Sequence, residues 1–272
     1  MEIIREIAVT AGVFVGLGAL MGAMLAAASR AFAVKTDPRI DAVRSNLPGA
    51  NCGGCGFAGC SAFAEALVEG RAAPSGCAAA DSAAVDEICR ILGVEAGHSV
   101  RMRAQVMCSG TSEASKKKYI YSGISDCLSA VTLGGGDKLC PNGCIGLGTC
   151  TRSCKFGAIS VRDGVAVVDY DLCRACGMCV SACPKGLIEL VPFESRYFVG
   201  CRSVDDGKTT RRNCDVGCIS CRLCEKACDA DAISVDDFVA HIDYSKCTGC
   251  GKCSDKCPRK IIKSSDIMSG RA

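Results

Sequence analysis

The spacing of the cysteines constrains this chain more than any other feature. Two stretches near the C-terminus, 218-CISCRLCEKAC-228 and 247-CTGCGKCSDKCP-258, each contain a complete C-x2-C-x2-C-x3-C run. Bacterial proteins that bind two iron–sulfur clusters carry such runs, and the fourth cysteine of each run ligates the other cluster. The 25 cysteines are also an odd number, so disulfides could not pair all of them within one chain. The spacing therefore predicts [4Fe–4S] sites and not a disulfide framework.

The pattern occurs twice, at an offset of 74 residues. The motif AISV at 158–161 returns at 232–235, and Pro184 returns as Pro258. In this register the cysteines at 127, 140, 144, 150, 154, 173, 176, 179 and 183 correspond to those at 201, 214, 218, 224, 228, 247, 250, 253 and 257. Such self-similarity indicates a duplicated unit. It predicts two tandem modules, 127–200 and 201–272, with a short hairpin turning at 236–238 in the second.

The interleaving rule assigns ligands to three of the four clusters in these modules. The three predicted sets are Cys218, Cys221, Cys224 and Cys257; Cys228, Cys247, Cys250 and Cys253; and Cys154, Cys173, Cys176 and Cys179.

The remaining set, Cys144, Cys150 and Cys183, lacks a fourth member because Leu147 stands where the rhythm requires cysteine. We expect Cys140 to complete it around a [4Fe–4S] core; the alternative is a [3Fe–4S] cluster held by three cysteines. This choice leaves four cysteines over, and our hypothesis is that they bind a sixth cluster between the modules. If they are free thiols, the chain holds five clusters. The four are Cys108, Cys127, Cys201 and Cys214.

A further site is predicted in 48-PGANCGGCGFAGCSAFAEALVEG-70. Cys52, Cys55 and Cys60 lie in one glycine-rich loop, and Cys77 closes the set after an amphipathic helix. Four cysteines suit a [4Fe–4S] cluster or a zinc ion, and the surrounding cysteine runs favour the cluster. Cys89, in a helical stretch, is expected to be a buried apolar residue. We expect a small, mostly helical domain over 31–100, followed by a linker over 101–126 that contains Cys108.

The N-terminal part, 1–30, is expected to anchor the chain in a membrane. Residues 7–28 contain no charge and are long enough to cross a bilayer as one helix. A signal peptide is the alternative, but the run exceeds the usual apolar region, and export would carry the thiols into an oxidising space. The excess of Lys and Arg after the run, including Lys35, predicts that the bulk of the chain is cytoplasmic. Paired G-x-x-x-G spacings at 12–16 and 18–22 favour close approach of another helix.

Composition excludes several other functions. A net charge of +3 and 5% aromatic residues give no indication of nucleic-acid binding. The LGGGDK stretch at 133–138 lacks the strand and helix of a dinucleotide site, and no nucleophile–base group is evident. We therefore expect electron transfer but no substrate-converting catalytic site on this chain. The basic run 116–118 is either a solvated surface or a patch that steers an acidic redox partner.

Together these elements predict an α+β protein: one transmembrane helix, a small helical 4Fe-4S domain, and two tandem ferredoxin-like modules. The order of an apolar helix, CGGCGFAGC and ferredoxin runs resembles the B subunit of the Rnf electron-transport complex. The resemblance covers essentially the whole chain. The duplicated region with PNGCIGLGTC and DVGCISC resembles the long form of that family.

The resemblance implies a component of a ferredoxin:NAD oxidoreductase that translocates Na+ or H+. It implies that the chain accepts electrons from reduced soluble ferredoxin and passes them to other subunits, with the site at Cys52, Cys55, Cys60 and Cys77 nearest the membrane. Two alternatives remain open: a membrane-tethered polyferredoxin of a hydrogenase or dehydrogenase, and a zinc-binding interaction module.

Overall fold

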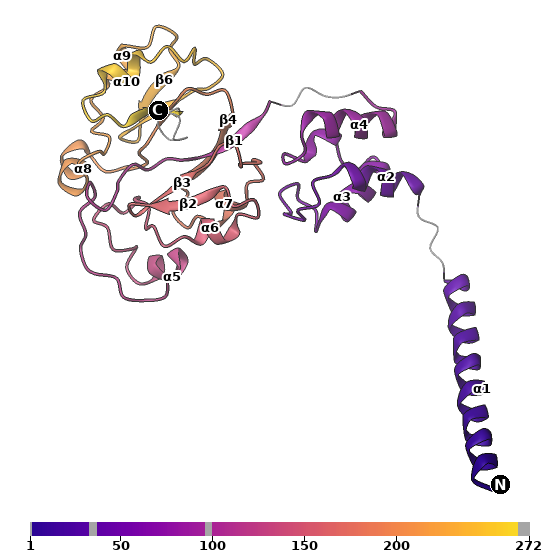
Figure 1. The fold of residues 1–272 in the computed structure, drawn as a ribbon. Coiled ribbons are helices and arrows are strands. Elements are labelled where there is room, and N and C mark those ends of the chain that lie inside the picture. The colour runs from indigo at the N-terminus through magenta and orange to yellow at the C-terminus, as the bar shows by residue number, and fades with distance from the viewer. Residues whose placement is uncertain (1, 33–36, 96–99, 266–272) are drawn as a thin grey trace.

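The computed structural model describes residues 2–32, 37–95 and 100–265 (Figure 1). Lys35, one of the basic residues after the apolar run, lies outside them. The first helix, α1 (Glu2–Ala31), covers the predicted apolar run. Its stretch Arg5–Ala31 is long and apolar enough to cross a membrane, and none of it is covered by the rest of the chain. A helix that exposes Phe14 and Leu25 in this way needs an apolar environment from elsewhere, as a bilayer provides.

Residues 37–95 form a small helical domain, as the sequence predicts. It contains α2 (Pro38–Asn46), α3 (Cys60–Val68), a 3-10 turn (Pro74–Gly76) and α4 (Ser82–Leu92). The side chains of Asp37 and Asp81 cap α2 and α4 by accepting backbone N–H bonds. Apolar side chains from all three α-helices are fully buried between them, including Val43, Phe63 and Ile88. This packing holds the glycine-rich loop 51–59 at one end of α3.

Residues 102–192 and 197–265 form two similar units, the first module and the second module. Each has an antiparallel hairpin, β2 (Ile159–Arg162) with β3 (Val165–Val168), and β6 (Ile233–Asp236) with β7 (Val239–Ile242). The second hairpin turns through Asp237 and Phe238, both with positive φ, as a two-residue turn of this type requires. The hairpin predicted at 236–238 is thus confirmed.

Short helices flank each hairpin. They are α6 (Thr149–Ser153) and α7 (Met178–Ala182) in the first module, and α9 (Leu223–Lys226) and α10 (Lys252–Lys256) in the second. Each lies within a cysteine run, so the runs alternate tight loops with single helical turns.

A second pair of strands closes each module. In the first, β1 (Met102–Val106) pairs with β4 (Ile188–Pro192); in the second, β5 (Tyr197–Val199) pairs with β8 (Ile262–Ser264). β1 lies in the segment 101–126 that we expected to be a linker, and its Ala104 and Val106 belong to the core of the first module. This segment therefore begins as part of the first module.

The registers show that β1 and β5 are counterparts. Val106 lies opposite Ile188, and Val199 lies opposite Ile262, which is 74 residues further on. The next backbone N–H groups agree: Met107 donates to Leu187 at 2.7 Å, and Gly200 donates to Ile261 at 2.7 Å. The cysteine that follows β1 by two residues, Cys108, is therefore the structural counterpart of Cys201, in place of Cys127.

The modules differ in the segment between this cysteine and the first cysteine run. Cys108 precedes Cys140 by 32 residues, whereas Cys201 precedes Cys214 by only 13. The longer segment contains α5 (Cys127–Thr132), and the shorter one contains α8 (Gly207–Asn213). Figure 1 shows α5 at the edge of the first module on the side of α6. The longer segment also reaches the second module, where Lys116 N donates to Asn213 O at 3.0 Å.

Candidate iron–sulfur sites

All 25 cysteines are free thiols, and most gather in groups of four. In the N-terminal domain, Cys52, Cys55, Cys60 and Cys77 line one hollow with about 330 Å³ of space not filled by protein atoms. The loop positions them because Asn51 Oδ1 accepts from Cys60 N at 2.9 Å, which closes the loop onto α3. These are the four residues expected from the sequence.

The second module brings together both sets expected there. Cys218, Cys221, Cys224 and Cys257, the second inner site, line a hollow of about 330 Å³. Cys228, Cys247, Cys250 and Cys253 form the second outer site. The pKa of Cys253 is raised to about 11, chiefly by burial and to a smaller extent by the neighbouring thiols of Cys247 and Cys228. The interleaved order of ligands therefore arises from the fold itself.

The first outer site has the same arrangement. Its cysteines are Cys154, Cys173, Cys176 and Cys179. Burial raises the pKa of Cys179 to about 12, with further contributions from the other three thiols. The matching backbone donors are kept as well: Ala158 N donates to Cys154 Sγ, and Ala232 N donates to Cys228 Sγ, both at 3.3 Å.

The incomplete set of Cys144, Cys150 and Cys183 is completed by Cys127 and not by Cys140. Cys127, Cys144, Cys150 and Cys183, the first inner site, line a hollow of about 360 Å³. Burial raises the pKa of Cys150 to about 12, and the next contributions come from Cys144, Cys127 and Cys183. This corrects the expectation that Cys140 lies there. Linear spacing suggested Cys140, but the longer segment folds back and carries Cys127 to the place of the missing thiol.

Polar contacts at the start of α5 position Cys127. Asp126 caps this helix by accepting from Ser129 N at 2.9 Å. Thr149 Oγ1 accepts from Cys127 N at 2.7 Å and donates to Asp126 Oδ1 at 2.8 Å. Arg152 Nη2 reaches the same carboxylate oxygen at 3.0 Å. These contacts, with backbone hydrogen bonding the chief cause, hold the pKa of Asp126 at about 2. The start of α5 is thereby fastened to α6.

The loop around Leu147 keeps the shape of its counterpart in the second module. Gly146 and Gly148 have φ of 78° and 77°, and the equivalent Ser220 and Arg222 have φ of 54° and 56°. The backbone has therefore kept the wrapping form of a ligand loop, although a half-buried leucine has replaced the thiol. Only the sulfur atom comes from elsewhere.

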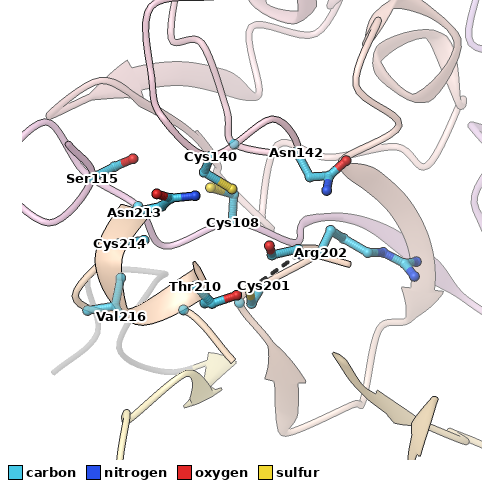
Figure 2. Close-up of a pocket in the computed structure, with 15 residues that line it drawn as sticks. Cys108, Ser115, Cys140, Asn142, Cys201, Arg202, Thr210, Asn213, Cys214 and Val216 are labelled. Carbon is cyan, nitrogen blue, oxygen red and sulfur yellow. Dashed lines mark hydrogen bonds between the residues drawn. The ribbon is translucent and has the colours of Figure 1, made fainter. Parts of the chain in front are cut away.

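Cys140 lies in a fourth hollow, the junction site, where the two modules meet. Its four cysteines are Cys108, Cys140, Cys201 and Cys214, and they border about 400 Å³ of unfilled space (Figure 2). The sequence hypothesis grouped Cys127 with Cys108, Cys201 and Cys214, whereas the structure places Cys140 with these three. Cys89 is buried in α4, as expected for an apolar role.

The donor sets fit clusters better than single metal ions. In the described part of the chain, no three His, Cys, Asp or Glu side chains approach closely enough to share one ion. Tetrahedral zinc needs all four sulfurs at about 2.3 Å from one centre. The thiols instead surround hollows, and backbone N–H groups point at their sulfur atoms, as is usual for iron–sulfur ligands.

The N-terminal site lies against the first outer site. Cys176 borders the same hollow as Cys52 and Cys55. The contact at Gly54 is so close that an added Cβ would lie 2.2 Å from Cys176 O. Glycine is therefore required at position 54 by the approach of the neighbouring backbone.

The basic run 116–118 is partly engaged in the long segment. Lys117 forms an ion pair with Asp137 at 2.9 Å, and Lys118 donates to Gly134 O at 2.7 Å. These contacts favour a structural role for two of the three lysines.

Known proteins match the chain in both its parts and its whole. A family model for an Fe-S cluster domain matches residues 47–79, a 4Fe-4S binding domain matches 166–189, and a 4Fe-4S dicluster domain matches 217–262.

Three relatives match nearly the full length. The B subunit of the Na(+)-translocating ferredoxin:NAD(+) oxidoreductase complex of Acetobacterium woodii is 42% identical over 99% of this chain and 81% of its own. The B subunit of the ion-translocating oxidoreductase complex of Methanosarcina acetivorans is 45% identical, over 96% and 98%. The B subunit of the proton-translocating ferredoxin:NAD(+) oxidoreductase complex of Clostridium ljungdahlii is 40% identical, over 93% and 90%.

Proposed function

The chain belongs to the B-subunit family of Rnf-type ion-translocating ferredoxin:NAD oxidoreductases, and from this premise we infer that it is the iron–sulfur electron-transfer component of such a complex. We propose that it accepts electrons from reduced ferredoxin and relays them to partner subunits, which couple the flow to NAD reduction and to translocation of Na+ or H+. The observation that carries this proposal is the contact of the N-terminal site with the first outer site at Gly54 and Cys176. It gives electrons a route between the ferredoxin-like modules and the domain next to the membrane helix.

Five [4Fe–4S] clusters are proposed, one at each of the N-terminal, first inner, first outer, second inner and second outer sites. The four cysteines of each site are the proposed ligands. When bound, each cluster supplies one-electron oxidation and reduction. The chain supplies thiolates and backbone N–H donors, and it keeps the sulfur atoms largely out of water. Because burial raises the pKa of thiols such as Cys150 and Cys224, these thiolates are stable only when iron replaces their protons.

We propose the second outer site as the entry point for ferredoxin. Its Cys250 is exposed, whereas the equivalent Cys176 is partly covered by the N-terminal domain. Exposed lysines stand at 246, 252 and 256, in and just before its cysteine run; Lys246 forms an ion pair with Asp243, and Lys252 forms one with Asp229. Positive charge at this position favours the approach of an acidic electron carrier.

The anchor completes the proposal. α1 would cross the membrane once, with the domains on the cytoplasmic side, and its uncrowded glycines at 12, 16, 18 and 22 would face helices of other subunits.

Anaerobic iron and sulfide analysis of the full chain, with EPR spectroscopy after dithionite reduction, tests this function. We expect at least about 20 irons per chain, since five [4Fe–4S] clusters hold four irons each. A colourless protein with stoichiometric zinc would refute the proposal. Proteins that co-purify with the tagged chain test the complex: hydrogenase or dehydrogenase subunits would instead support a tethered polyferredoxin.

A further inference from the structure

The junction site joins the two modules, and we propose that it binds a sixth [4Fe–4S] cluster that carries electrons from one module to the other. Two of its thiols, Cys108 and Cys140, come from the first module, and Cys201 and Cys214 come from the second. This inference rests on the proposed function and deepens it, because it completes the route between the exposed second outer site and the N-terminal site.

The four thiols are related by the internal repeat. Cys108 and Cys201 each follow the last residue of an equivalent strand, β1 or β5, by two positions. Cys140 and Cys214 each begin an equivalent C-x2-G-C stretch, 140-CPNGC-144 and 214-CDVGC-218. Each module thus contributes the same two positions to one hollow. A pair of chance cysteines in one module would not produce this symmetry.

Matching hydrogen bonds connect the junction site to both inner sites. Cys144 N donates to Cys108 Sγ at 3.4 Å in the first module, and Cys218 N donates to Cys201 Sγ at 3.3 Å in the second. Cys144 and Cys218 belong to the first and second inner sites. A cluster at the junction would therefore be separated from each inner cluster by one residue and one N–H···S bond.

Glycines lie beside the sulfurs of the junction site. At Gly110 an added Cβ would lie 3.5 Å from Cys214 Sγ and 3.7 Å from Cys108 Sγ. Gly143, on the first module's cysteine loop, lines the same hollow. Figure 2 shows the sulfurs of Cys108 and Cys140 near each other at the middle of the hollow, with Cys201 and Cys214 around it.

Buried polar atoms at this hollow are without partners. Within the described residues, Ser115 Oγ, Asn142 Nδ2 and Asn213 Oδ1 are buried and make no hydrogen bond, and all three residues line the junction site. Buried polar groups nearly always have partners, so unpaired donors indicate a missing acceptor. The sulfide and thiolate sulfurs of a cluster would accept from Ser115 and Asn142.

Positive charge next to the hollow matches an anionic occupant. Lys138 is 4% exposed, and its ammonium donates to Gly110 O at 2.6 Å and Gly164 O at 3.0 Å. Arg259 Nη2 donates to Cys214 O at 2.7 Å. A buried ammonium is stabilised by negative charge nearby, and a cluster with four thiolates provides it.

Each proposed relay step transfers one electron. One electron that leaves the reduced second inner cluster arrives at the junction, and one electron then leaves the junction for the oxidised first inner cluster. No atom is transferred, and reduced ferredoxin is the reductant that supplies the chain.

Iron counts in single and double variants of the full chain test the site. We expect about 24 irons per wild-type chain, and about four fewer in each of Cys140→Ser and Cys214→Ser. The double variant should lose no more than either single one, because both residues hold the same cluster. Cys127→Ser combined with Cys140→Ser should lose about twice as much, and Cys89→Ser should lose none.

Additive losses in the Cys140/Cys214 double variant would overturn the inference, since the two residues would then belong to different sites. Full iron in either single variant would also overturn it. Both results would leave the proposed function intact if the other five clusters remain, whereas zinc in place of iron would remove both. As a second measurement, freeze-quench EPR should show that Cys140→Ser is reduced by ferredoxin at the second module first, with delayed reduction of the N-terminal cluster. Unchanged timing would contradict the relay.

Discussion

The two modules have the same hairpins and outer sets of cysteines, yet the fourth thiol of the inner site comes from different places in the chain. In the second module Cys221 lies within the cysteine loop. In the first, Leu147 occupies that position and Cys127 arrives from α5. The place of a sulfur atom is therefore kept between the modules more strictly than the segment that provides it.

The modules also differ in how much of them is covered. The first outer site is packed against the N-terminal domain, whereas Cys250 of the second is exposed. Lys138 of the first module is buried, but Arg212, 74 residues further on, is exposed. The first module therefore lies in the middle of the proposed electron route, and the second module lies at the end that is exposed to solvent.

The largest effect is expected from Cys127→Ser. It should remove about four irons or leave a [3Fe–4S] cluster, as Cys221→Ser should in the second module. Adding Leu147→Cys should restore the lost iron, because the loop around Leu147 keeps the backbone of a ligand loop. Iron analysis and EPR of the oxidised protein measure both steps.

Cys127→Ser with its full iron content would show that the first inner site uses another ligand. Failure of Leu147→Cys to restore iron would show that the two inner loops differ more than their φ angles indicate.

Gly54→Val should break the contact that distinguishes the two outer sites. Its Cβ would overlap Cys176 O, and overpacking of this kind costs about 1–3 kcal/mol. We expect slower reduction of the N-terminal cluster by the modules with an unchanged iron count, measured by freeze-quench EPR. Ala58→Val, an exposed position in the same loop, is the matched control. Equal rates in both variants would mean that electrons take another path.

Thr149→Val removes a contact that only the first module has, since its counterpart is Leu223. The Cys127 N–H would lose its acceptor, at a cost of about 1 kcal/mol for a half-buried donor. The first inner cluster should then be released faster by an iron chelator, followed by visible absorbance. Thr132→Val makes the same chemical change on an exposed face of α5 and should have no effect. Similar release from both variants would argue against positioning by Thr149.

Lys138→Met should give the smallest effect, a more negative reduction potential of the clusters beside it. Removal of a buried positive charge disfavours the reduced, more negative form. Arg212→Met, on the exposed counterpart, should change nothing measurable because water screens that charge. Redox titrations followed by EPR compare the two. A larger shift for Arg212→Met would contradict the difference in burial.

The sequence predicted the sites whose ligands lie at short, fixed spacing. The N-terminal set and the interleaved sets of the second module came together as expected because short loops leave the thiols few other arrangements. The helical N-terminal domain and the hairpin at 236–238 followed from local patterns as well.

The sequence did not predict which distant cysteine completes the first inner site. A constant offset of 74 paired Cys127 with Cys201, although the strand registers pair Cys108 with Cys201. A signal was present in V-x-C, at 106–108 and at 199–201. The strand pairings are needed to recognise it. The longer segment between Cys108 and Cys140 changes the residue offset between the two modules, but it leaves the equivalent strands in equivalent places.

The division of the junction ligands between the modules also has a mechanical consequence. Metal binding free energy adds to folding free energy when the site exists only in the folded state. A cluster with two ligands from each module would cross-link the modules, so that neither module could unfold alone without releasing the cluster. Oxidative loss of that single cluster would then have two effects: it would interrupt electron transfer between the modules, and it would allow each module to unfold independently of the other.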